Sequence, residues 1–570
     1  MYILGINSAY HESSACLVRD GELLAFVEEE RCNRIKHAKI SMVNNPDEIP
    51  FGAIDYCLNY AGISLADIDH FSYSFVPSER LNNMSINDEF EEGHWGSKIG
   101  EETFNRRILS IPSKFDALLN SNISLKFHWV RHHLCHAGSA FFVSPFENAA
   151  ILSVDGIGEF TTTLLALGTA NNIQVVKEIV YPNSIGLLWE KVSKYLGFSE
   201  YDAAKLMGLS AYGKPDKFLS SFKSIVTIGE EGNFTINDAV TKLRKNDFSG
   251  LEALFGKKRD SIDEIDERHA DIAAALQTIT GEVLLSLVQH LHEQAKCENL
   301  CIAGGVGLNC VANKLIADSG LFKNLYIQPA SNDAGTAIGA AYYTWNHLLN
   351  NKRTYVMDTA YLGPEYSKTE ILAVLRRNNL KYQYCENIEK EVAKLISSGK
   401  VVGWFQGRME GGPRGLGNRS LLADPRNPEI RNILNVKVKH REYFRPFAPS
   451  VMEDKANEWF VLKENPQPYY FMLMVCNVRP NKRHLIPAVI HVDETSRIHL
   501  VKEQGNSKFY KLIKEFEKIT GIPLVLNTSF NDREPIVCTP QDAVNTFLRT
   551  RIDAIALGDY LLLRGIDDNA

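Results

Sequence analysis

The sequence lacks the features that mark secreted, membrane-spanning and zinc-ribbon proteins. Its ten cysteines are scattered without a Cys-x-x-Cys pair, so neither a zinc ribbon nor a disulfide framework is indicated. No apolar run approaches the roughly 20 residues that cross a bilayer. Met1 leads directly into the strand-like segment 2–6, without the charged start of a signal peptide. We therefore predict a cytoplasmic protein that does not engage a membrane.

Positive charge is also scarce. The chain has 62 Lys and Arg against 69 Asp and Glu, and its net charge is −7. This balance argues against a nucleic-acid-binding body, although it leaves room for a local basic cleft. The apolar share of 45% and the charged share of 23% are ordinary for a globular protein. Because 570 residues exceed what one core can organise, we expect two to four structural units.

One plan, a strand, a polar loop, a strand, a turn and a strand, occurs twice in the first half. The first copy has strands at 2–6, 14–18 and 22–27, with the hairpin turn Asp20-Gly21. The second copy has strands at 150–154, 161–167 and 173–176. The recurrence predicts an internal duplication with two similar lobes that present loops to a shared cleft. The alternative is that hairpins are simply common.

Helices and strands alternate from residue 270 onward. The pattern predicts helices at 270–296, 310–318 and 334–345, and strands at 300–303 and 325–328. This alternation is typical of a mostly parallel sheet covered by helices. The polar stretch 352–359 is a candidate linker. We therefore expect a first domain at 1–355, with lobes at 1–145 and 146–355, and a second domain at 356–570.

A histidine pair offers a candidate metal site. His132 and His136 follow the strand-like run 124–130 and would share one face of a helix. With 16 histidines, chance alone gives about 0.45 pairs at this spacing, so an ordinary helix start with polar histidines is the alternative. His128 and His132 also fit, but His128 lies inside the strand-like run. His290 and His292 are two residues apart and would point in different directions on a helix.

Basic side chains concentrate on Gly-rich segments of the second half. The first group is Arg408, Arg414, Arg419 and Arg426, and the second is Lys437, Lys439, His440, Arg441 and Arg445. A polar segment, 527–531, follows a strand predicted at 523–526 and offers further neutral donors. Arginine binds phosphate bidentately, and glycine lets the backbone approach closely. A phosphate pocket is the interpretation we prefer, and a solvated basic face is the alternative.

Several motifs along the whole chain, taken in order, resemble one family. In the first half they are Gly5-Ile6-Asn7, His11, Ser13-Ser14-Ala15, Glu28-Glu29-Glu30-Arg31, Arg34, Lys36-His37, His132-His133-Leu134-Cys135-His136-Ala137, Asp155-Gly156, Gly158-Glu159, Lys205-Leu206-Met207-Gly208 and Gly304-Gly305-Val306-Gly307-Leu308-Asn309. In the second half they are Gly412-Pro413-Arg414-Gly415-Leu416-Gly417-Asn418-Arg419, Arg445-Pro446-Phe447 and Asn527-Thr528-Ser529-Phe530-Asn531. The chain resembles the O-carbamoyltransferases of the nodulation-protein-U and cephalosporin-carbamoylating type, which include the tobramycin carbamoyltransferase.

This resemblance implies an α/β fold and a two-stage reaction. The first domain would be a duplicated actin/sugar-kinase-like (TsaD-like) domain, and the second a YrdC-like α/β domain with a mixed twisted sheet. Carbamoyl phosphate and ATP would give carbamoyl adenylate and pyrophosphate in the second domain. In the first domain, a hydroxyl of an antibiotic, another secondary metabolite or a saccharide would take the carbamoyl group as AMP leaves.

The resemblance also assigns residues. In the first domain it implies a divalent metal, with iron(II) preferred over manganese or zinc, held by His132, His136, Asp155 and Asp333. It implies contacts to the adenylate from Lys36, Gly304, Gly305, Asn309 and Lys205. In the second domain, Mg²⁺-bound ATP and carbamoyl phosphate would contact Arg408, Arg414, Arg419, Lys439, Arg441, Arg445, Asn527 and Ser529. His11 is our candidate general base, and a merely hydrogen-bonding loop histidine is the alternative.

Two positions depart from the family pattern. An acidic residue followed by Phe or Tyr is expected before the basic loop, and the sequence has Glu410-Gly411-Gly412 there. Cys32 stands where an aromatic residue is frequent. Both departures keep the charged groups but allow a differently shaped loop.

Three other functions compete with O-carbamoylation. They are tRNA threonylcarbamoylation, phosphoryl transfer by a sugar-kinase relative, and non-catalytic nucleotide sensing. The acidic net charge counts against the first, and the basic second half counts against the others. We expect no nucleic-acid partner, and a homodimer is compatible with the sequence. The acceptor is not named by any motif, and its specificity is expected in segments 75–107 and 183–202.

Overall fold

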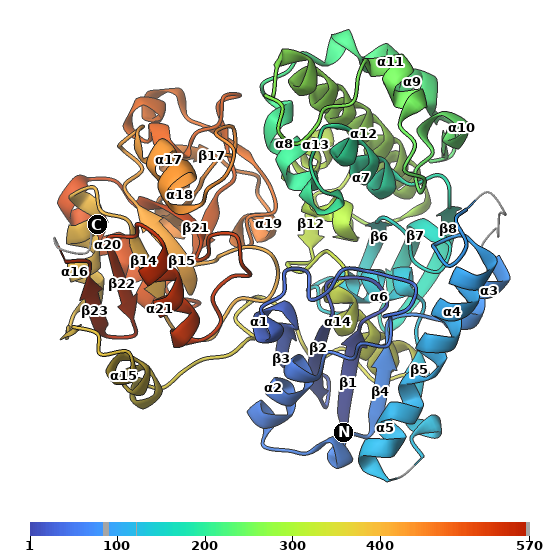
Figure 1. Cartoon of the computed structure of the whole chain (residues 1–570), viewed down its shortest axis with the longest axis horizontal. Coiled ribbons are helices and arrows are strands. Elements are labelled where there is room, and N and C mark those ends of the chain that lie inside the picture. The colour runs from blue at the N-terminus through green and yellow to red at the C-terminus, as the bar shows by residue number, and fades with distance from the viewer. Residues whose placement is uncertain (84–89, 121, 566–570) are drawn as a thin grey trace. The chain divides into compact units, whose positions relative to one another are not determined.

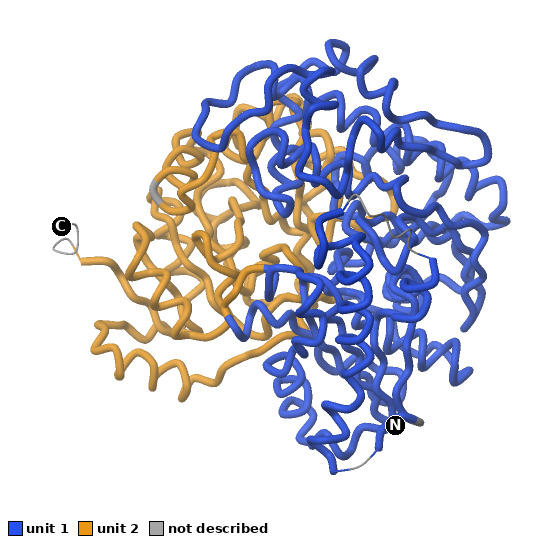
Figure 2. Tube along the Cα trace, turned by 45° about the vertical axis from the view of Figure 1, so that its right-hand side comes forward, with its two compact units in different colours: residues 1–33, 37–358 blue, residues 34–36, 359–570 orange. Residues whose placement is uncertain are grey.

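The computed structural model describes residues 1–83, 90–120 and 122–565 (Figure 1). The chain forms two compact units. Unit 1 comprises residues 1–33 and 37–358, and unit 2 comprises residues 34–36 and 359–570 (Figure 2). The short segment 34–36 therefore belongs with the second half of the chain. Arg34 donates hydrogen bonds from its guanidinium to the carbonyls of Pro535 and Ile536, at 2.7 and 2.8 Å.

Unit 1 contains the same five-stranded sheet twice. The first has the order β3-β2-β1-β4-β5 and the second β12-β11-β6-β7-β8. In each, the first three strands in chain order are antiparallel and the last two join in parallel. The strands are β1 Tyr2–Asn7, β2 Ser14–Arg19, β3 Glu22–Glu28, β4 His70–Tyr73, β5 Phe127–Trp129, β6 Asn148–Val154, β7 Thr161–Thr169, β8 Asn172–Val180, β11 Asn299–Ala303 and β12 Asn324–Ile327. The predicted duplication is confirmed, and so is the α/β fold class.

Helices cover both sheets. The longer ones are α2 Phe51–Ala61, α4 Lys98–Leu109, α5 Ile111–Leu119, α6 His132–Phe141, α7 Ile185–Tyr195, α8 Ala203–Ser210, α12 Glu267–Gln294, α13 Cys310–Ser319 and α14 Gly335–Tyr342. By length and composition α12 could cross a membrane, but 72% of its most apolar window is buried inside the protein, which is typical of a core helix. Shorter elements complete the unit: α1 Glu30–Asn33, α3 Pro77–Asn83, α9 Leu219–Ile225, α10 Asp238–Thr241, α11 Ser249–Phe255, β9 Val226–Ile228 and β10 Phe234–Ile236.

Two central helices, α6 and α14, pack against each other and exchange sheets. Helix α6 follows the first sheet but packs on β6, β7 and β11 of the second. Helix α14 follows the second sheet but packs on β1, β2 and β4 of the first. Glycines allow the two backbones to touch, because a Cβ on Gly339 would lie 1.6 Å from the carbonyl oxygen of Cys135. No side chain larger than hydrogen fits there.

Unit 2 is built on one mixed eight-stranded sheet, as predicted. Its order is β13-β23-β22-β14-β15-β21-β16-β20, with parallel pairs at β14–β22 and β16–β20. The strands are β13 Gln383–Tyr384, β14 Val402–Phe405, β15 Arg419–Ala423, β16 Ala448–Met452, β20 His499–Val501, β21 Leu524–Ser529, β22 Ala554–Leu557 and β23 Tyr560–Leu563. The longer helices are α15 Lys368–Arg377, α16 Ile388–Ser397, α18 Glu453–Trp459, α20 Ser507–Thr520 and α21 Pro540–Arg549. Thr539 caps α21 in a capping box with Asp542.

Three predicted elements differ from the structure. The strand expected at 124–130 is a 3₁₀ turn, Ser124–Lys126, followed by the three-residue β5. The helix expected at 334–345 is α14 continued by a π-helix, Tyr343–Leu348. The polar segment 527–529 is part of β21, because that strand lies between β15 and β16 and pairs with both. Two neighbouring ladders keep polar residues extended where sequence propensity favours a turn.

The contact of α6 with α14 predicts a strong size limit at Gly339. The Gly339→Ala variant should lose about 1–3 kcal/mol of unfolding free energy, because the added methyl would overlap the Cys135 carbonyl. Thermal and denaturant unfolding measure the loss. Gly229→Ala is the matched control, since its Cβ would meet nothing nearer than 3.4 Å. Equal stability of the two variants would contradict this packing.

Candidate functional site

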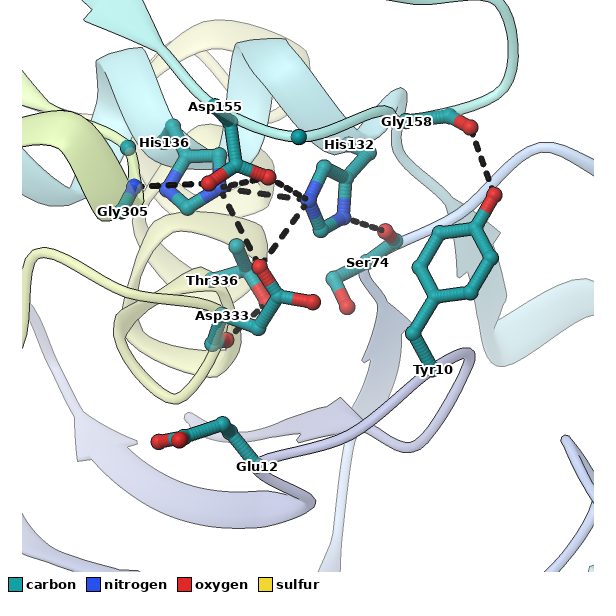
Figure 3. A network of polar contacts seen from close by, with 12 residues as sticks. Tyr10, Glu12, Ser74, His132, His136, Asp155, Gly158, Gly305, Asp333 and Thr336 are labelled. Carbon is teal, nitrogen blue, oxygen red and sulfur yellow. Dashed lines mark hydrogen bonds and ion pairs between the residues drawn. The ribbon is translucent and has the colours of Figure 1, made fainter. Parts of the chain in front are cut away.

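Four buried side chains of unit 1 converge at the start of the two central helices. His132 and His136 lie on α6, Asp155 follows β6, and Asp333 precedes α14 (Figure 3). One ligand atom from each lies within 4.8 Å of all the others. All four were predicted as metal ligands, and the structure brings them together. The alternative pair fails geometrically, because His128 lies on β5 and its ring contacts His70 at 2.9 Å.

The distances between these atoms suit ligands around one ion. The two Nε2 atoms of His132 and His136 are 3.2 Å apart. From them to the nearest carboxylate oxygens of Asp155 and Asp333 the distances are 3.5 to 3.8 Å. With bonds of about 2.1 Å, ligand atoms around a tetrahedral ion lie ~3.4 Å apart. A donor set of two imidazoles and two carboxylates accommodates iron(II), manganese or zinc. The residues present therefore fit a divalent metal.

Neighbouring groups orient these ligands. The Nδ1 of His132 faces the carbonyl oxygen of Ser74 at 3.3 Å, so in the neutral ring Nε2 carries the lone pair and is directed at the cluster. The backbone N–H of Gly305 donates to Asp155 Oδ1 at 2.7 Å, so Oδ2 is the oxygen that faces the histidines. The carboxylate of Glu159 accepts from the N–H of His132 at 3.0 Å and so fixes the first turn of α6.

The cluster is strongly coupled electrostatically. Burial by itself lowers the pKa of His132. The carboxylates of Asp333 and Asp155 raise it by more than that, so the pKa is well above its usual value. Burial raises the pKa of Asp155, but hydrogen bonds and charge from the two histidines hold it well below its usual range. His133 faces no carboxylate as closely, and burial lowers its pKa to about 3. The site is thus built to keep two carboxylates ionised in a buried place.

His11 lies on the loop between β1 and β2, beside this cluster. The amide of Asn7 holds the loop by donating to the carbonyls of residues 11 and 12, and it accepts from Ser74 Oγ at 2.9 Å. The His11 Nδ1 is buried without a hydrogen-bond partner among the described residues. Burial lowers the His11 pKa, but Asp333 and Glu12 raise it more, so the net pKa is raised. Its role as a general base stays a prediction.

Glu190 on α7 is a neighbour of the cluster that sequence reasoning missed. Its Oε1 would lie 3.3 Å from a Cβ on Gly156, next to Asp155. Burial raises the pKa of its carboxyl to about 7, and the charge of His11 opposes that rise. No motif marks this residue, which lies in the middle of an ordinary amphipathic helix.

The predicted adenylate contacts of unit 1 have other partners in the structure. Gly305 donates its N–H to Asp155, and Asn309 caps α13 while its amide donates to Gln277 at 3.0 Å. Gly304 has φ +87°, and a Cβ there would lie 2.2 Å from the Val154 carbonyl oxygen. Lys205 forms an ion pair with Asp202 at 3.1 Å. These four assignments remain predictions.

Unit 2 gathers cations, of which Lys439 is buried and Arg441 and Arg445 are half-buried. The Lys439 ammonium donates to the Ser529 carbonyl at 2.5 Å and to Asn531 at 2.7 Å. Burial, reinforced by the charges of Arg441 and Arg445, lowers its pKa well below the usual value. Burial and the charge of Arg445 likewise lower the Arg441 pKa, and Arg497 adds to that shift. Within the described chain, Arg441 Nη2 is buried without a hydrogen-bond partner.

Two further cations of unit 2, Arg497 and Lys36, were not predicted to lie beside Lys439 and Arg441. Arg497 was missed, because it is a single cation far from the basic loops in the sequence. Lys36 was assigned to the first domain, but it belongs to unit 2, where its charge lowers the pKa of Lys439. We call the set Lys36, Lys439, Arg441, Arg445 and Arg497 the cation cluster.

Other predicted residues of unit 2 serve the loop between β14 and β15. Arg419 is fully buried, and its guanidinium donates to carbonyls of residues 364, 406, 407 and 418 while it lies 3.7 Å from the Phe405 ring. Arg408 donates to the carbonyls of Leu362 and Gly363. Neither is brought into the cation cluster. Arg414 is half-buried on the loop itself.

Glu410 organises that loop. Its Oε1 accepts three backbone N–H groups, from Leu416, Asn418 and Arg419, at 2.7 to 3.1 Å. The family pattern led us to notice this acidic residue, but the sequence did not reveal its bonding. Asn527 on β21 donates to the Gly415 carbonyl at 3.0 Å, and its Oδ1 is buried without a hydrogen-bond partner in the described chain.

The sequence is similar to carbamoyltransferases along most of its length. The model for the carbamoyltransferase N-terminus matches residues 2–342, and that for the carbamoyltransferase C-terminus matches residues 393–564. The nodulation protein NolNO of Sinorhizobium fredii is 36% identical, covering 98% of this chain and 79% of its own. An uncharacterized protein of Synechocystis sp. is 38% identical, covering 99% of this chain and 97% of its own. The chain is an enzyme that transfers carbamoyl groups. It belongs to the carbamoyltransferase family of the nodulation proteins.

Solved structures show a more distant likeness. HypF of T. kodakarensis is 12% identical and aligns with 61% of this chain and 48% of its own, with a TM-score of 0.31. At that distance the likeness carries no argument about the chemistry.

The buried His and Asp cluster predicts a measurable metal affinity. His136→Ala should weaken binding of Fe²⁺, Mn²⁺ and Zn²⁺ by more than the roughly 10- to 100-fold that loss of an outer partner costs. Competition with a coloured chelator measures the affinity without any activity assay. His128→Ala is the control, because His128 on β5 contacts His70 on β4 and is not one of the four clustered ligands. Equal metal affinity in both variants would disprove the assignment.

Proposed function

We propose that the protein is an ATP-dependent O-carbamoyltransferase that acts in two stages. In unit 2, water cleaves carbamoyl phosphate to carbamate and phosphate. The carbamate oxygen then attacks the α-phosphorus of Mg²⁺-bound ATP, which gives carbamoyl adenylate and releases pyrophosphate. In unit 1, a hydroxyl of a small-molecule acceptor attacks the carbamoyl carbon, and AMP leaves. The acceptor is a saccharide, an antibiotic or another secondary metabolite.

The cation cluster is the observation that carries this proposal. Five basic side chains gather in unit 2, and the mutual repulsion of Lys439, Arg441 and Arg445 adds to the cost of their burial. Lys439 is buried, Arg441, Arg445 and Arg497 are half-buried, and Lys36 is exposed. Like charges gathered in this way are costly unless an anion compensates them. Carbamoyl phosphate and ATP are both anionic, so together they supply that charge. Preorganised cations also neutralise the charge that develops on leaving phosphates.

The transfer stage uses the residues of unit 1. A divalent ion held by His132, His136, Asp155 and Asp333 would supply Lewis acidity to the carbamoyl carbonyl or grip the adenylate phosphate. His11 takes the proton of the acceptor hydroxyl on Nδ1, which has no other partner in the described chain. Asn7 keeps that imidazole in place through the loop carbonyls. Gly304, Gly305, Asn309 and Lys205 contact the adenylate.

Iron(II) is the ion we propose, because nitrogen and oxygen donors in equal number suit it. We also propose that the enzyme acts in the cytoplasm, where its ten cysteines would stay reduced. An RNA acceptor is disfavoured by the net charge of −7.

Exchange of labelled pyrophosphate into ATP tests the first stage. Wild-type protein should catalyse this exchange only when carbamoyl phosphate is present, because the label enters ATP by reversal of adenylate formation. Arg441→Gln should slow it by about 10²–10³-fold, the typical cost of one lost charge-stabilising donor. Arg376→Gln, an exposed arginine on α15, is the matched control and should exchange normally. Absence of exchange in active wild-type preparations would sink the proposal.

Substitutions in unit 1 and in unit 2 should affect the two stages of the reaction separately. His136→Ala should keep carbamoyl-phosphate-dependent exchange, because unit 2 retains its cation cluster, yet it should lose transfer to an acceptor. Mass spectrometry detects transfer as a carbamoyl mass shift. If His136→Ala and Arg441→Gln lose exchange equally, the division of chemistry between the units is wrong.

A further inference from the structure

A second cationic place lies in unit 1, outside the metal-ligand cluster. Arg244 has only 10% of its side chain exposed. Its guanidinium lies 5.9 Å from the Trp95 ring and 5.6 Å from the Tyr181 ring. Its Nη1 is buried without a hydrogen-bond partner among the described residues. A buried guanidinium nitrogen with no partner is costly, so it needs an explanation.

The charges around Arg244 do not balance. The nearest carboxylate is Glu101, whose Oε1 lies 3.7 Å from Arg244 Nη2. That carboxylate already forms a bidentate pair with the buried Arg80, at 2.6 and 2.9 Å. Burial lowers the pKa of Arg244, and the positive charge of Arg80 lowers it further. Among the described residues, Arg80 and Arg244 thus share the Glu101 carboxylate, and Arg244 makes the longer of the two contacts.

Two neighbouring carboxylates of the described chain hydrogen-bond to groups other than Arg244. The Glu159 carboxylate is turned to the backbone N–H groups of Val76 and His132. Asp238 accepts from the Tyr181 hydroxyl at 3.2 Å and from the Leu243 N–H at 2.7 Å. Both carboxylates are therefore committed elsewhere.

The loop that carries Arg244 is rigidly supported. The buried Lys191 ammonium donates to the carbonyls of Lys242, Lys245 and Asp247, at 2.9, 2.5 and 2.9 Å. One internal cation thus holds three carbonyls of residues 242–247, and the tip of this loop points Arg244 at the aromatic rings. A preorganised side chain of this kind loses little entropy on binding.

The chemistry of this place indicates its ligand. Guanidinium groups pair with carboxylate, sulfate and phosphate, and half-buried Trp and Tyr rings offer flat apolar faces beside the charge. We propose that Arg244, Trp95 and Tyr181 form a subsite for an anionic group of the carbamoyl acceptor, which is therefore an acidic hydroxyl compound such as an acidic saccharide. This assignment of substrate class rests on the proposed carbamoylation of a hydroxyl compound.

The subsite is linked to the metal-ligand cluster through one layer of residues. Arg80 also lies against the Trp95 ring, and its Nη1 donates to the Tyr10 hydroxyl at 2.7 Å and to the Glu159 carbonyl at 3.1 Å. The Tyr10 ring in turn meets the His132 ring edge-on, with centroids 6.2 Å apart. The proposal therefore puts the anionic group of the acceptor one layer of residues away from the cluster, where the adenylate phosphate is expected.

Fluorescence of Trp95 tests the subsite in the full-length protein. The probes are D-glucuronate, the neutral D-glucose, and inorganic sulfate. Glucuronate should change the tryptophan emission saturably, and Trp95→Phe should abolish the change. Arg244→Gln should weaken glucuronate binding by about tenfold or more, as expected for a lost charged hydrogen bond. Arg244→Lys should bind with intermediate affinity, and the exposed Arg106→Gln on α4 should bind as the wild type does.

Every result of these binding measurements either supports or overturns the subsite. Stronger binding of glucuronate than of glucose, lost in Arg244→Gln, supports the subsite, and competition by sulfate supports the anionic determinant. No binding of glucuronate by the wild type, or equal binding by Arg244→Gln and wild type, overturns the proposal. Displacement of glucuronate by AMP would also overturn it, since the subsite would then serve the donor. Pyrophosphate exchange by the wild type reports separately on the proposed function, so the two failures are distinguishable.

Discussion

The closeness of α6 and α14 is the constraint on which unit 1 depends. Backbone meets backbone at Gly339 and Cys135, with no room for a methyl group. Helix α6 carries His132 and His136, and α14 begins just after Asp333. Their separation therefore sets the spacing of the buried ligands. This packing constraint fixes the size of the site, because ligands on rigid elements cannot adjust independently.

Buried charge is handled in three ways across the protein. At the metal-ligand cluster, histidines and carboxylates compensate each other. Arg419 spreads its charge over backbone carbonyls and the Phe405 ring, and so it serves the structure internally. Arg441 Nη2 in the cation cluster and Arg244 Nη1 are buried without a hydrogen-bond partner in the described chain, and we attribute both to anionic ligands. The presence or absence of hydrogen-bond partners therefore distinguishes structural cations from ligand-binding cations better than the number of cations does.

Local patterns predicted much of this protein. The duplicated strands follow from hydrophobic periodicity and turn residues, which are properties of short segments, whereas the mixed second sheet followed from the family resemblance. The convergence of His132, His136, Asp155 and Asp333 followed only from the family resemblance, since three separate elements bring them together. Arg244 and Arg497 were missed, because burial and the lack of a partner are properties of the folded state.

The exchange of α6 and α14 has a consequence for the history and independence of the two lobes. Each sheet is covered by a helix that belongs, by chain order, to the other repeat. Separated from its partner, either lobe would expose one face of its sheet and leave one apolar helix uncovered. The arrangement is that of a domain-swapped dimer whose two subunits have become a single chain. Fusion keeps the partners in a fixed ratio, so the two halves of the metal-ligand cluster could diverge into a histidine half and a carboxylate half.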